Sequence, residues 1–240
     1  MRIKNEARWI ADVIESQLPL VDELYIFDDH SDDDTAQICQ SFDKVKFFPS
    51  LFEGLDESRD KQWLLDRIIS DLPAVEINGD SPYWILAIDG DELLSKEAPN
   101  QIRQAVLSGE SNVYSLKIRY LWNSRNQIRV DGVYAKFARP SVFRLINPAF
   151  KYISTPFGNG ANLHCSSIPQ EYLGHAKPCE AEILHLGYMQ ADDRIRKYEW
   201  YNRIDPGNAG EDCYRHMVVG DIFTADSKFR YGGPLKLQKL

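Results

Sequence analysis

The stretch from Tyr83 to Leu94, YWILAIDGDELL, constrains the fold of this chain more than any other. Its first half is a near-continuous run of apolar strand formers, which is typical of a strand buried on both faces in the centre of a parallel sheet. The run ends abruptly in three carboxylates, Asp89, Asp91 and Glu92, with Gly90 between the first two. Acidic side chains crowded at the end of a buried strand repel one another unless a cation lies among them.

The end of this strand predicts a ligand site. In open α/β sheets, ligands bind at the carboxyl ends of the strands. Gly90 lets the backbone turn tightly, so that Asp89 and Asp91 can reach one point. Carboxylate oxygens suit Mg²⁺ or Mn²⁺, which often bridges a protein to a phosphate. The alternative interpretation is a solvated acidic turn that follows a strand.

A second strand runs into acidic residues near the start of the chain. The apolar segment Leu24 to Phe27 is followed by DDHSDDDT. Asp33 or Asp34 is a good N-cap for a helix from Thr35 to Phe42. Asp28 lies at the strand end, too far upstream to cap that helix. The spacing does not fit a calcium loop of the EF-hand type, because no glycine and no closing glutamate follow in register.

Length and composition limit the classes of protein that this chain can represent. At 240 residues it fits one sizeable domain. The net charge of −8 argues against broad nucleic-acid binding, which needs a basic face. The four cysteines are widely spaced, so we expect reduced thiols and neither a zinc site nor a disulfide framework. Without a signal peptide or a long apolar run, we expect a cytoplasmic protein with no transmembrane segment.

The order of predicted elements favours an α/β fold. In residues 1–94, helices and strands alternate, which implies a parallel sheet with helices on both faces. Residues 95–210 change character, with longer strands and loops rich in aromatic and basic side chains, and the tail from Ser227 is basic, rich in glycine and expected to be mobile. The predicted helices are 7–18, 35–42, 60–70, 98–107 and 192–204, and the predicted strands are 24–27, 45–48, 83–88, 113–121, 128–130, 141–145 and 181–188.

Four short motifs follow one another along the chain. Asn5 and Glu6 form an early Asn-Glu pair, and the acidic sequence DDHSDDDT follows the next strand. Asp89, Gly90 and Asp91 form an Asp-x-Asp motif after an apolar strand. A later His-x-Gly-Tyr motif precedes a basic helix that ends in Asp-Pro, with the residues His185, Gly187, Tyr188, Arg194, Lys197, Tyr198, Asp205 and Pro206. With these motifs in this order, the chain resembles glycosyltransferase family 2 over residues 1 to about 206.

The resemblance implies a GT-A fold, with a mostly parallel, Rossmann-like central sheet flanked by helices and a smaller mixed sheet on the acceptor side. It implies one domain, with a nucleotide-sugar-binding half (1–94), an acceptor-side half (95–210) and a C-terminal tail (211–240). The implied activity is transfer of a sugar from a nucleotide-diphosphate sugar to a hydroxyl of a saccharide, lipid-linked or protein acceptor, with inversion. A location at the inner face of the membrane is compatible with such acceptors.

The family's donor-site roles can be carried over to several residues of this chain. Asn5 and Glu6 are implied to bind the nucleotide sugar, and Asp28 is the candidate for the base or ribose, ahead of Asp29. A divalent ion, Mn²⁺ or Mg²⁺, held by Asp91 would stabilise the charge on the leaving diphosphate. Asp89 would share that ion or accept hydrogen bonds from the ribose or sugar.

Further side chains have two interpretations each. Arg59 and Lys61, at the start of the helix at 60–70, either bind the diphosphate or are surface charges. His185 is a third metal ligand, a pyrophosphate contact or a histidine of the core. Trp122 either stacks on a sugar or is buried in the core. The acceptor hydroxyl needs a general base, for which Glu92 and Asp131 are the candidates.

Two departures from the family pattern leave other functions open. The first strand is shortened to a stub, and the nearest match to the family's His-Glu pair is NLHCSS at Asn162 to Ser167. A non-catalytic nucleotide-binding protein with a GT-A shell is therefore one alternative. A phosphatase of the haloacid dehalogenase type is another, although Leu93 stands where that family has Thr or Val. A nucleotidyltransferase is weaker still, since no glycine-rich phosphate loop lies near the start.

Overall fold

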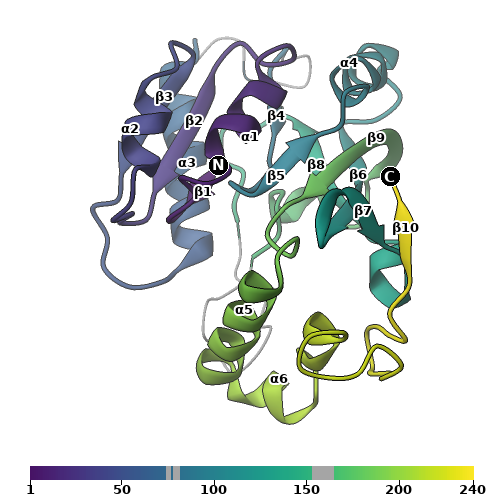
Figure 1. Ribbon diagram of the computed structural model, residues 1–240. Coiled ribbons are helices and arrows are strands. Elements are labelled where there is room, and N and C mark those ends of the chain that lie inside the picture. Colours follow the sequence, from purple (N-terminus) through teal and green to yellow (C-terminus); the bar gives the residue numbers. More distant parts are fainter. Residues whose placement is uncertain (74–76, 78–81, 153–164) are drawn as a thin grey trace.

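The computed structural model describes residues 1–73, 77, 82–152 and 165–240, and it has a mixed α/β architecture (Figure 1). Its α-helices are α1 (Ile10–Gln17), α2 (Thr35–Gln40), α3 (Glu57–Asp71), α4 (Ala98–Ser108), α5 (Ala191–Ile204) and α6 (Pro206–Gly210). Its strands are β1 (Arg2–Ile3), β2 (Leu24–Asp28), β3 (Val45–Pro49), β4 (Trp84–Leu86), β5 (Glu92–Leu94), β6 (Val113–Trp122), β7 (Ser124–Arg129), β8 (Ala138–Arg144), β9 (Lys177–His185) and β10 (Leu237–Lys239).

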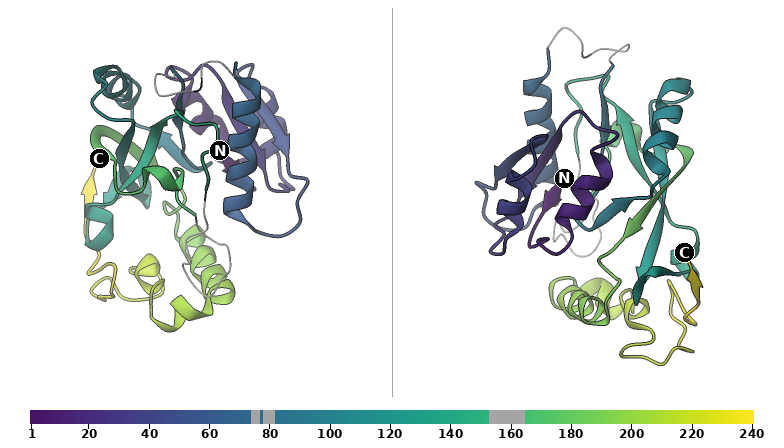
Figure 2. Two further views of the ribbon diagram at one scale, coloured as in Figure 1. Left: turned by 180° about the vertical axis from the view of Figure 1, so that it is seen from behind. Right: turned by 45° about the horizontal axis from the view of Figure 1, so that its top comes forward.

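The N-terminal part is a small parallel sheet with helices on both faces, as the alternating pattern predicted (Figure 2). Its strand order is β1-β2-β3. Leu24 and Ile26 of β2 pack in one hydrophobic cluster with residues of α1 and α2. Phe27 points to the other face, where its ring lies 5.4 Å from that of Trp63 on α3. The period of two along β2 therefore places a helix layer on each side.

The remaining strands form a larger, mostly antiparallel sheet. Five of its strands follow the order β10-β7-β6-β8-β4, and β9 pairs in parallel with β6 and antiparallel with β5. Helix α4 covers this sheet, with Ile102 in the same hydrophobic cluster as Ile183 of β9. The predicted α/β class is confirmed, but the mixed sheet is the larger of the two and the parallel sheet the smaller.

The segment Tyr83 to Ile88 is not the central parallel strand that its apolar run predicted. Its strand, β4, pairs antiparallel with β8 and with no other described strand. Both faces of the segment nevertheless make apolar contacts. Trp84 and Leu86 pack against one hydrophobic cluster, and Tyr83 and Ile85 pack against another. The residues of β4 are partly buried and make apolar contacts on both faces, which accounts for the apolar run. Such a run carries no information about the direction of the neighbouring strand.

The helices α2 and α3 begin in different ways. The N-cap of α2 is Asp34, one of the two predicted residues, but its side chain makes no capping hydrogen bond. Asp33, one residue earlier, accepts a hydrogen bond from the backbone N–H of Thr35 at 3.0 Å. Asp56 caps α3 by accepting from the N–H of Arg59 at 3.0 Å, and α3 therefore begins before the predicted Asp60. Of the stretch Asn162 to Ser167, residues 162–164 lie outside the described part of the chain.

The C-terminal tail is held in place, contrary to the expectation that it is mobile. Its last strand, β10, pairs with β7. The buried Asp131 carboxylate accepts a hydrogen bond from the backbone N–H of Lys236 at 3.0 Å. Arg194 of α5 donates to both oxygens of Asp221, at 2.6 and 2.7 Å. The glycines and basic residues of this segment serve a folded connection, which composition alone does not distinguish from a flexible one.

Candidate functional site

The loop after β4 carries the acidic residues around which the candidate site is built. Gly90 is required there by close packing, since a Cβ at this position would lie 2.8 Å from Cγ2 of Ile3 and 3.0 Å from Cγ of Glu6. The loop thus lies directly against the end of β1. Its carboxylates diverge, however: Asp91 lines a cavity that reaches α5, whereas Asp89 pairs with Arg139 on β8. The prediction that both aspartates reach one point is therefore not met in this arrangement.

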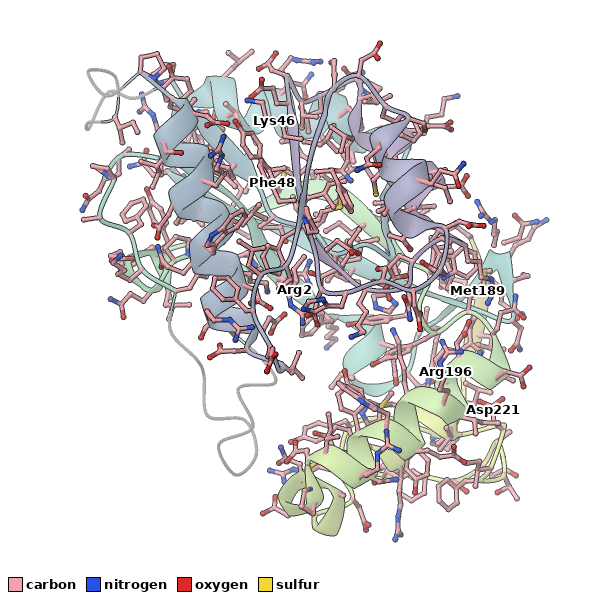
Figure 3. The ribbon with its side chains drawn as sticks, turned by 90° about the vertical axis from the view of Figure 1, so that its left-hand side faces the viewer. Arg2, Lys46, Phe48, Met189, Arg196 and Asp221 are labelled. Carbon is pink, nitrogen blue, oxygen red and sulfur yellow. The ribbon has the colours of Figure 1, made fainter. Side chains whose placement is uncertain are left out.

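The cavity has a volume of ≈ 1040 Å³ and lies between the β1–α1 connection and α5. Figure 3 shows this side of the molecule, with α5 and its Arg196 below the end of β1 that carries Arg2. Acidic and basic side chains alternate around it, with the indole of Trp200 beside them. The described residues that line it are Lys4, Asn5, Glu6, Arg8, Trp9, Asp29, His30, Gly54, Leu55, Asp91, Gly187, Asp193, Arg196, Lys197, Glu199, Trp200 and Arg203.

At the inner end of the cavity, Asp91 is paired with Lys197. The Nζ of Lys197 donates to Oδ2 of Asp91 at 3.0 Å, and Nε2 of His185 lies 3.6 Å from the same oxygen. Gly187 makes this approach possible, because a Cβ there would collide with both Asp91 Oδ2 and Lys197 Nζ. The His-x-Gly-Tyr motif thus places a histidine and a Cβ-free position against one carboxylate.

His185 is a neutral imidazole in this environment. Burial lowers its pKa from 6.5 to about 4, although the Asp91 carboxylate favours the charged form. Its Nδ1 is buried and has no hydrogen-bond partner in the described part of the chain. Rings of Tyr120 and Tyr188 lie 5.1 and 4.9 Å from the imidazole. His185 therefore packs in an aromatic cluster, as a core histidine would, and also contacts Asp91, which lines the cavity.

Asp89 and Glu92 are joined by Arg139. The guanidinium donates to Asp89 Oδ2 at 2.9 Å and also to Glu92 Oε2. Burial would raise the pKa of Asp89, but the Arg139 guanidinium outweighs it and the pKa lies well below its ordinary value. Burial raises the pKa of Glu92 to about 7, and the negative charge of Asp89 adds to the effect. Glu92 is 1% exposed, so its carboxylate does not face the cavity, and the geometry gives it a link to Arg139 rather than access to an acceptor hydroxyl.

Asn5 and Glu6 do line the cavity, as the resemblance implied. Asn5 adopts a left-handed conformation (φ 55°), and its side-chain oxygen accepts from the N–H of Asp32 at 2.9 Å. The backbone N–H of Glu6 donates to Oγ1 of Thr35 at 2.8 Å. Burial, with the nearby Asp91 carboxylate, raises the pKa of Glu6 to about 8. Burial and the Asp91 carboxylate thus favour the protonated form of Glu6, which can donate a hydrogen bond to an anionic ligand.

Asp28 and Asp29 differ in what they face. Asp28 is buried, and its carboxylate accepts hydrogen bonds from the hydroxyl and the backbone N–H of Ser31, which closes the turn after β2. Asp29 lines the cavity and is bound by Arg2 at 2.5 Å. Of the two, the structure brings Asp29 rather than Asp28 to the cavity, in reverse of the order that the resemblance implied.

Arg59 and Lys61 are not placed to bind a diphosphate in this cavity. Arg59 donates to the carbonyl oxygens of Glu53 and Gly54 at 3.1 and 2.9 Å and to Asp60 at 2.9 Å, so it organises the loop before α3. Lys61 pairs with Glu57 at 3.0 Å and lines a second cleft of ≈ 470 Å³, between β2 and β4, whose walls are largely apolar. Helix geometry sends these two side chains to different sides of α3.

Asp131 and Trp122 both stabilise the fold. Asp131 is not placed as the predicted general base, and Trp122 is not placed to stack on a sugar. Asp131 accepts two hydrogen bonds from the buried Arg129, at 2.8 and 2.9 Å, as well as the backbone N–H groups of Gly233 and Lys236. Trp122 is 1% exposed, with the guanidinium of Arg129 4.6 Å from its ring centroid and that of Arg194 4.1 Å from it. No face of this indole is left for a sugar.

The residues predicted to hold a metal do not fit a divalent ion as they stand. Lys197 already occupies Oδ2 of Asp91, and Arg139 occupies Asp89. Within the residues that the structure describes, no three His, Cys, Asp or Glu side chains converge as a metal site would require. A cation bound at Oδ2 of Asp91 would have to displace the lysine ammonium, and Mn²⁺ or Mg²⁺ stays a prediction from the resemblance.

Sequence relatives support the class of protein that the motifs suggested. No known family model matches the sequence. A protein of Rickettsia felis, named as an uncharacterized glycosyltransferase, is 30% identical over 162 residues, which cover 66% of this chain and 48% of that protein. Uncharacterized proteins of Mycobacterium tuberculosis and Mycobacterium bovis are 22% identical over 248 residues, which cover 97% of this chain and 58% of theirs. The chain thus spans only about half of the length of the curated relatives it matches.

Solved structures of low identity also align with the chain. Staphylococcus aureus TarS (residues 1–349) in complex with UDP-GlcNAc aligns with a TM-score of 0.47 at 11% identity, covering 92% of this chain and 70% of that one. A mycobacterial protein aligns with a TM-score of 0.42 at 17% identity, covering 85% and 72%. The predicted resemblance to glycosyltransferases is confirmed by the Rickettsia relative.

Two residues of the site carried no assigned role in the sequence analysis. Lys197 belongs to the basic helix of the last motif, and its position ten residues after Gly187 gave no sign of a contact with Asp91. Arg139 lies in a segment with many basic residues. Both contacts join residues that are far apart in the chain, 106 and 50 positions respectively. A lysine that follows a His-x-Gly motif on the next helix is the signal that could have drawn attention to Lys197.

Proposed function

We propose that this chain forms the donor-binding part of a glycosyltransferase, which moves a sugar from a nucleoside-diphosphate sugar to an acceptor hydroxyl with inversion. The observation that carries the proposal is the cavity itself: the motif residues Asn5, Glu6, Asp91 and Gly187 come from distant parts of the sequence and line one space. The acceptor is a saccharide, lipid-linked or protein hydroxyl. Family 2 membership and a cytoplasmic location are part of the same proposal.

The chemistry requires positive charge and hydrogen-bond donors where the diphosphate leaves. Lys197 and the basic residues Lys4 and Arg203, which also line the cavity, are suited to this, and the raised pKa of Glu6 favours a form that donates a hydrogen bond. Among the described helices, none combines the length and apolarity needed to cross a bilayer.

A thermal-shift screen tests the proposal. The probes are UDP, GDP, CDP and dTDP and their common sugars, each with Mn²⁺ and each with a chelator. A ligand that binds the folded state alone raises the melting temperature, by an amount that grows with saturation. We expect one nucleotide to raise the melting temperature of the wild type and not that of Asp91→Asn. No shift with any nucleotide would contradict the proposal.

Catalysis is separated from binding by a second readout. The nucleotide sugar selected in the screen is incubated with the protein, and release of the nucleoside diphosphate is followed with and without a mixture of saccharide acceptors. Turnover supports the transferase. Binding without turnover favours the second candidate, a non-catalytic nucleotide-binding protein. Release of phosphate from a simple phosphomonoester would instead indicate the phosphatase alternative.

A further inference from the structure

Lys197 occupies the place at Asp91 that a metal ion would otherwise take. Its Nζ lies 3.0 Å from Asp91 Oδ2. The absence of a side chain at Gly187 is what leaves room for the ammonium, since a Cβ there would collide with both partners. The Tyr188 ring lies under the same Nζ, 5.1 Å from its centroid, and adds a cation–π contact. A carboxylate and an aromatic ring therefore hold one cation beside the cavity, and Gly187 leaves the space that it occupies.

The charge of Lys197 is permanent at neutral pH, and part of its hydrogen-bonding capacity remains for a ligand. Burial alone would lower the pKa of Lys197, but the Asp91 carboxylate outweighs it and holds that pKa above its ordinary value. An ammonium has three N–H donors, and the hydrogen bond to Asp91 uses one of them. The side chain is 30% exposed and lines the cavity.

We propose that Lys197, held by Asp91, is the cation that binds the diphosphate of the donor, so that nucleotide binding does not require a divalent metal ion. The inference rests on the proposed function of the cavity and departs from the metal-dependent reaction that the resemblance implies. Lys197 is the binding residue, and Asp91, Gly187 and Tyr188 position it.

The role of the ammonium follows from the bonds that change. The bond between the anomeric carbon and the diphosphate oxygen breaks, and its electron pair stays on the oxygen. The anomeric carbon gains a bond to the acceptor oxygen, whose proton passes to water. Negative charge therefore grows on a phosphate oxygen within reach of a fixed ammonium, which stabilises it as a metal ion would.

Isothermal titration with UDP, GDP, CDP and dTDP in turn tests the inference, in EDTA and in Mn²⁺. For the nucleotide that binds, we expect dissociation constants within about threefold of one another in the two conditions. Lys197→Met removes the charge at similar volume and should weaken binding about tenfold or more, which corresponds to the loss of one charge-assisted contact. Lys177→Met is the matched control, because Lys177 pairs with Glu110 on an exposed surface at 3.1 Å and should leave binding unchanged.

Each remaining outcome has one meaning. Binding that requires Mn²⁺, or that is unaffected by Lys197→Met, overturns the inference and leaves the proposed function standing. No binding of any nucleotide in either condition overturns the proposed function instead. Circular dichroism checks that Lys197→Met is folded. If Lys197→Met does not fold, Lys197→Arg replaces it as a variant that keeps the positive charge. The dissociation constants of the wild-type protein in EDTA and in Mn²⁺ show, without any variant, whether binding requires the metal ion.

Discussion

Two aspartates that sequence reasoning had singled out, Asp91 and Asp131, each pair with a cation, but in different settings. Asp131 is enclosed: both of its oxygens accept from Arg129, and they also bind the backbone of Gly233 and Lys236. Asp91 holds a single ammonium hydrogen bond, at 3.0 Å, beside a cavity of ≈ 1040 Å³.

The difference shows which ion pair can take part in binding. A planar guanidinium that donates to both oxygens of one carboxylate forms a closed unit. The backbone N–H groups of Gly233 and Lys236 join the Asp131 carboxylate to the C-terminal segment. A lysine ammonium beside open space keeps donors for a ligand. The first pair is therefore expected to govern stability, and the second to govern affinity for an anionic ligand.

Loss of the Asp131 carboxylate should have the largest effect on stability. Asp131→Ala would leave the buried Arg129 without its partner and would release two backbone N–H groups of the C-terminal segment. Breaking a buried pair in this way costs about 3–5 kcal/mol. Urea unfolding of the variant and the wild type measures the difference. A change of less than about 1 kcal/mol in the free energy of unfolding would contradict the structural role. If the folded variant binds nucleotide as the wild type does, Asp131 governs stability and not affinity.

The C-terminal connection should also make stability depend on pH through His216. Its Nδ1 lies 2.7 Å from the Tyr134 hydroxyl, and burial lowers its pKa from 6.5 to about 4. Below pH 6.5 the unfolded chain takes up a proton that the folded protein does not, so this contribution to stability is present above pH 6.5 and is lost as pH falls towards 4. The loss is at most about 3 kcal/mol.

The variant His216→Gln isolates this contribution. Urea unfolding is followed between pH 4 and pH 7 for the variant and the wild type. We expect a shallower dependence on pH in the variant, with the slope that remains coming partly from His185, whose pKa is lowered in the same way. Parallel curves for the two proteins would show that His216 is not held neutral by the fold.

Gly187→Ala should damage the open pair while leaving the enclosed pair intact. The added Cβ would collide with Asp91 Oδ2 and Lys197 Nζ and push them apart. Overpacking of this kind costs about 1–3 kcal/mol, and nucleotide affinity should fall with it. Gly210→Ala is the control, because a Cβ at Gly210 meets nothing within 4 Å. Equal melting temperatures and affinities for the two variants would show that Gly187 does not hold the pair.

Arg196→Ala should have the smallest effect on stability. The Arg196 side chain is 71% exposed, and its partner Asp193 also receives a hydrogen bond from Arg8 at 2.9 Å. Solvent-exposed pairs contribute little, so we expect a change within about 0.5 kcal/mol in urea unfolding. Arg196 also lines the cavity. If the variant loses nucleotide affinity while its stability is unchanged, the ligand site includes Arg196.

The sequence predicted those features that depend on neighbouring residues. The helix layers around β2, the start of α2 at Thr35 and the position of the acidic loop after β4 follow from local periodicity and from turn chemistry. The resemblance also implied that the Asn5–Glu6 segment and the acidic loop share one donor site, which stays a prediction. Both line or border the same cavity in the structure.

What the sequence could not supply are the partners of each charged side chain. Asp131 was a reasonable candidate base until its backbone partner at Gly233 was known, 102 positions away. Trp122 similarly has its two faces covered by arginines, one of them on α5. The direction of β4 depends on β8, which lies more than 50 residues later and shares no pattern with it. Such contacts are set by tertiary packing, for which residue type and spacing give no rule.

A crystal structure with the nucleoside diphosphate selected by the binding screen tests the central claim most directly. We expect the diphosphate to lie in the cavity between the β1–α1 connection and α5, with a phosphate oxygen within hydrogen-bond distance of Lys197 Nζ. Asp131 should still be enclosed by Arg129. A nucleotide bound instead in the apolar cleft between β2 and β4, beside Lys61, would contradict it.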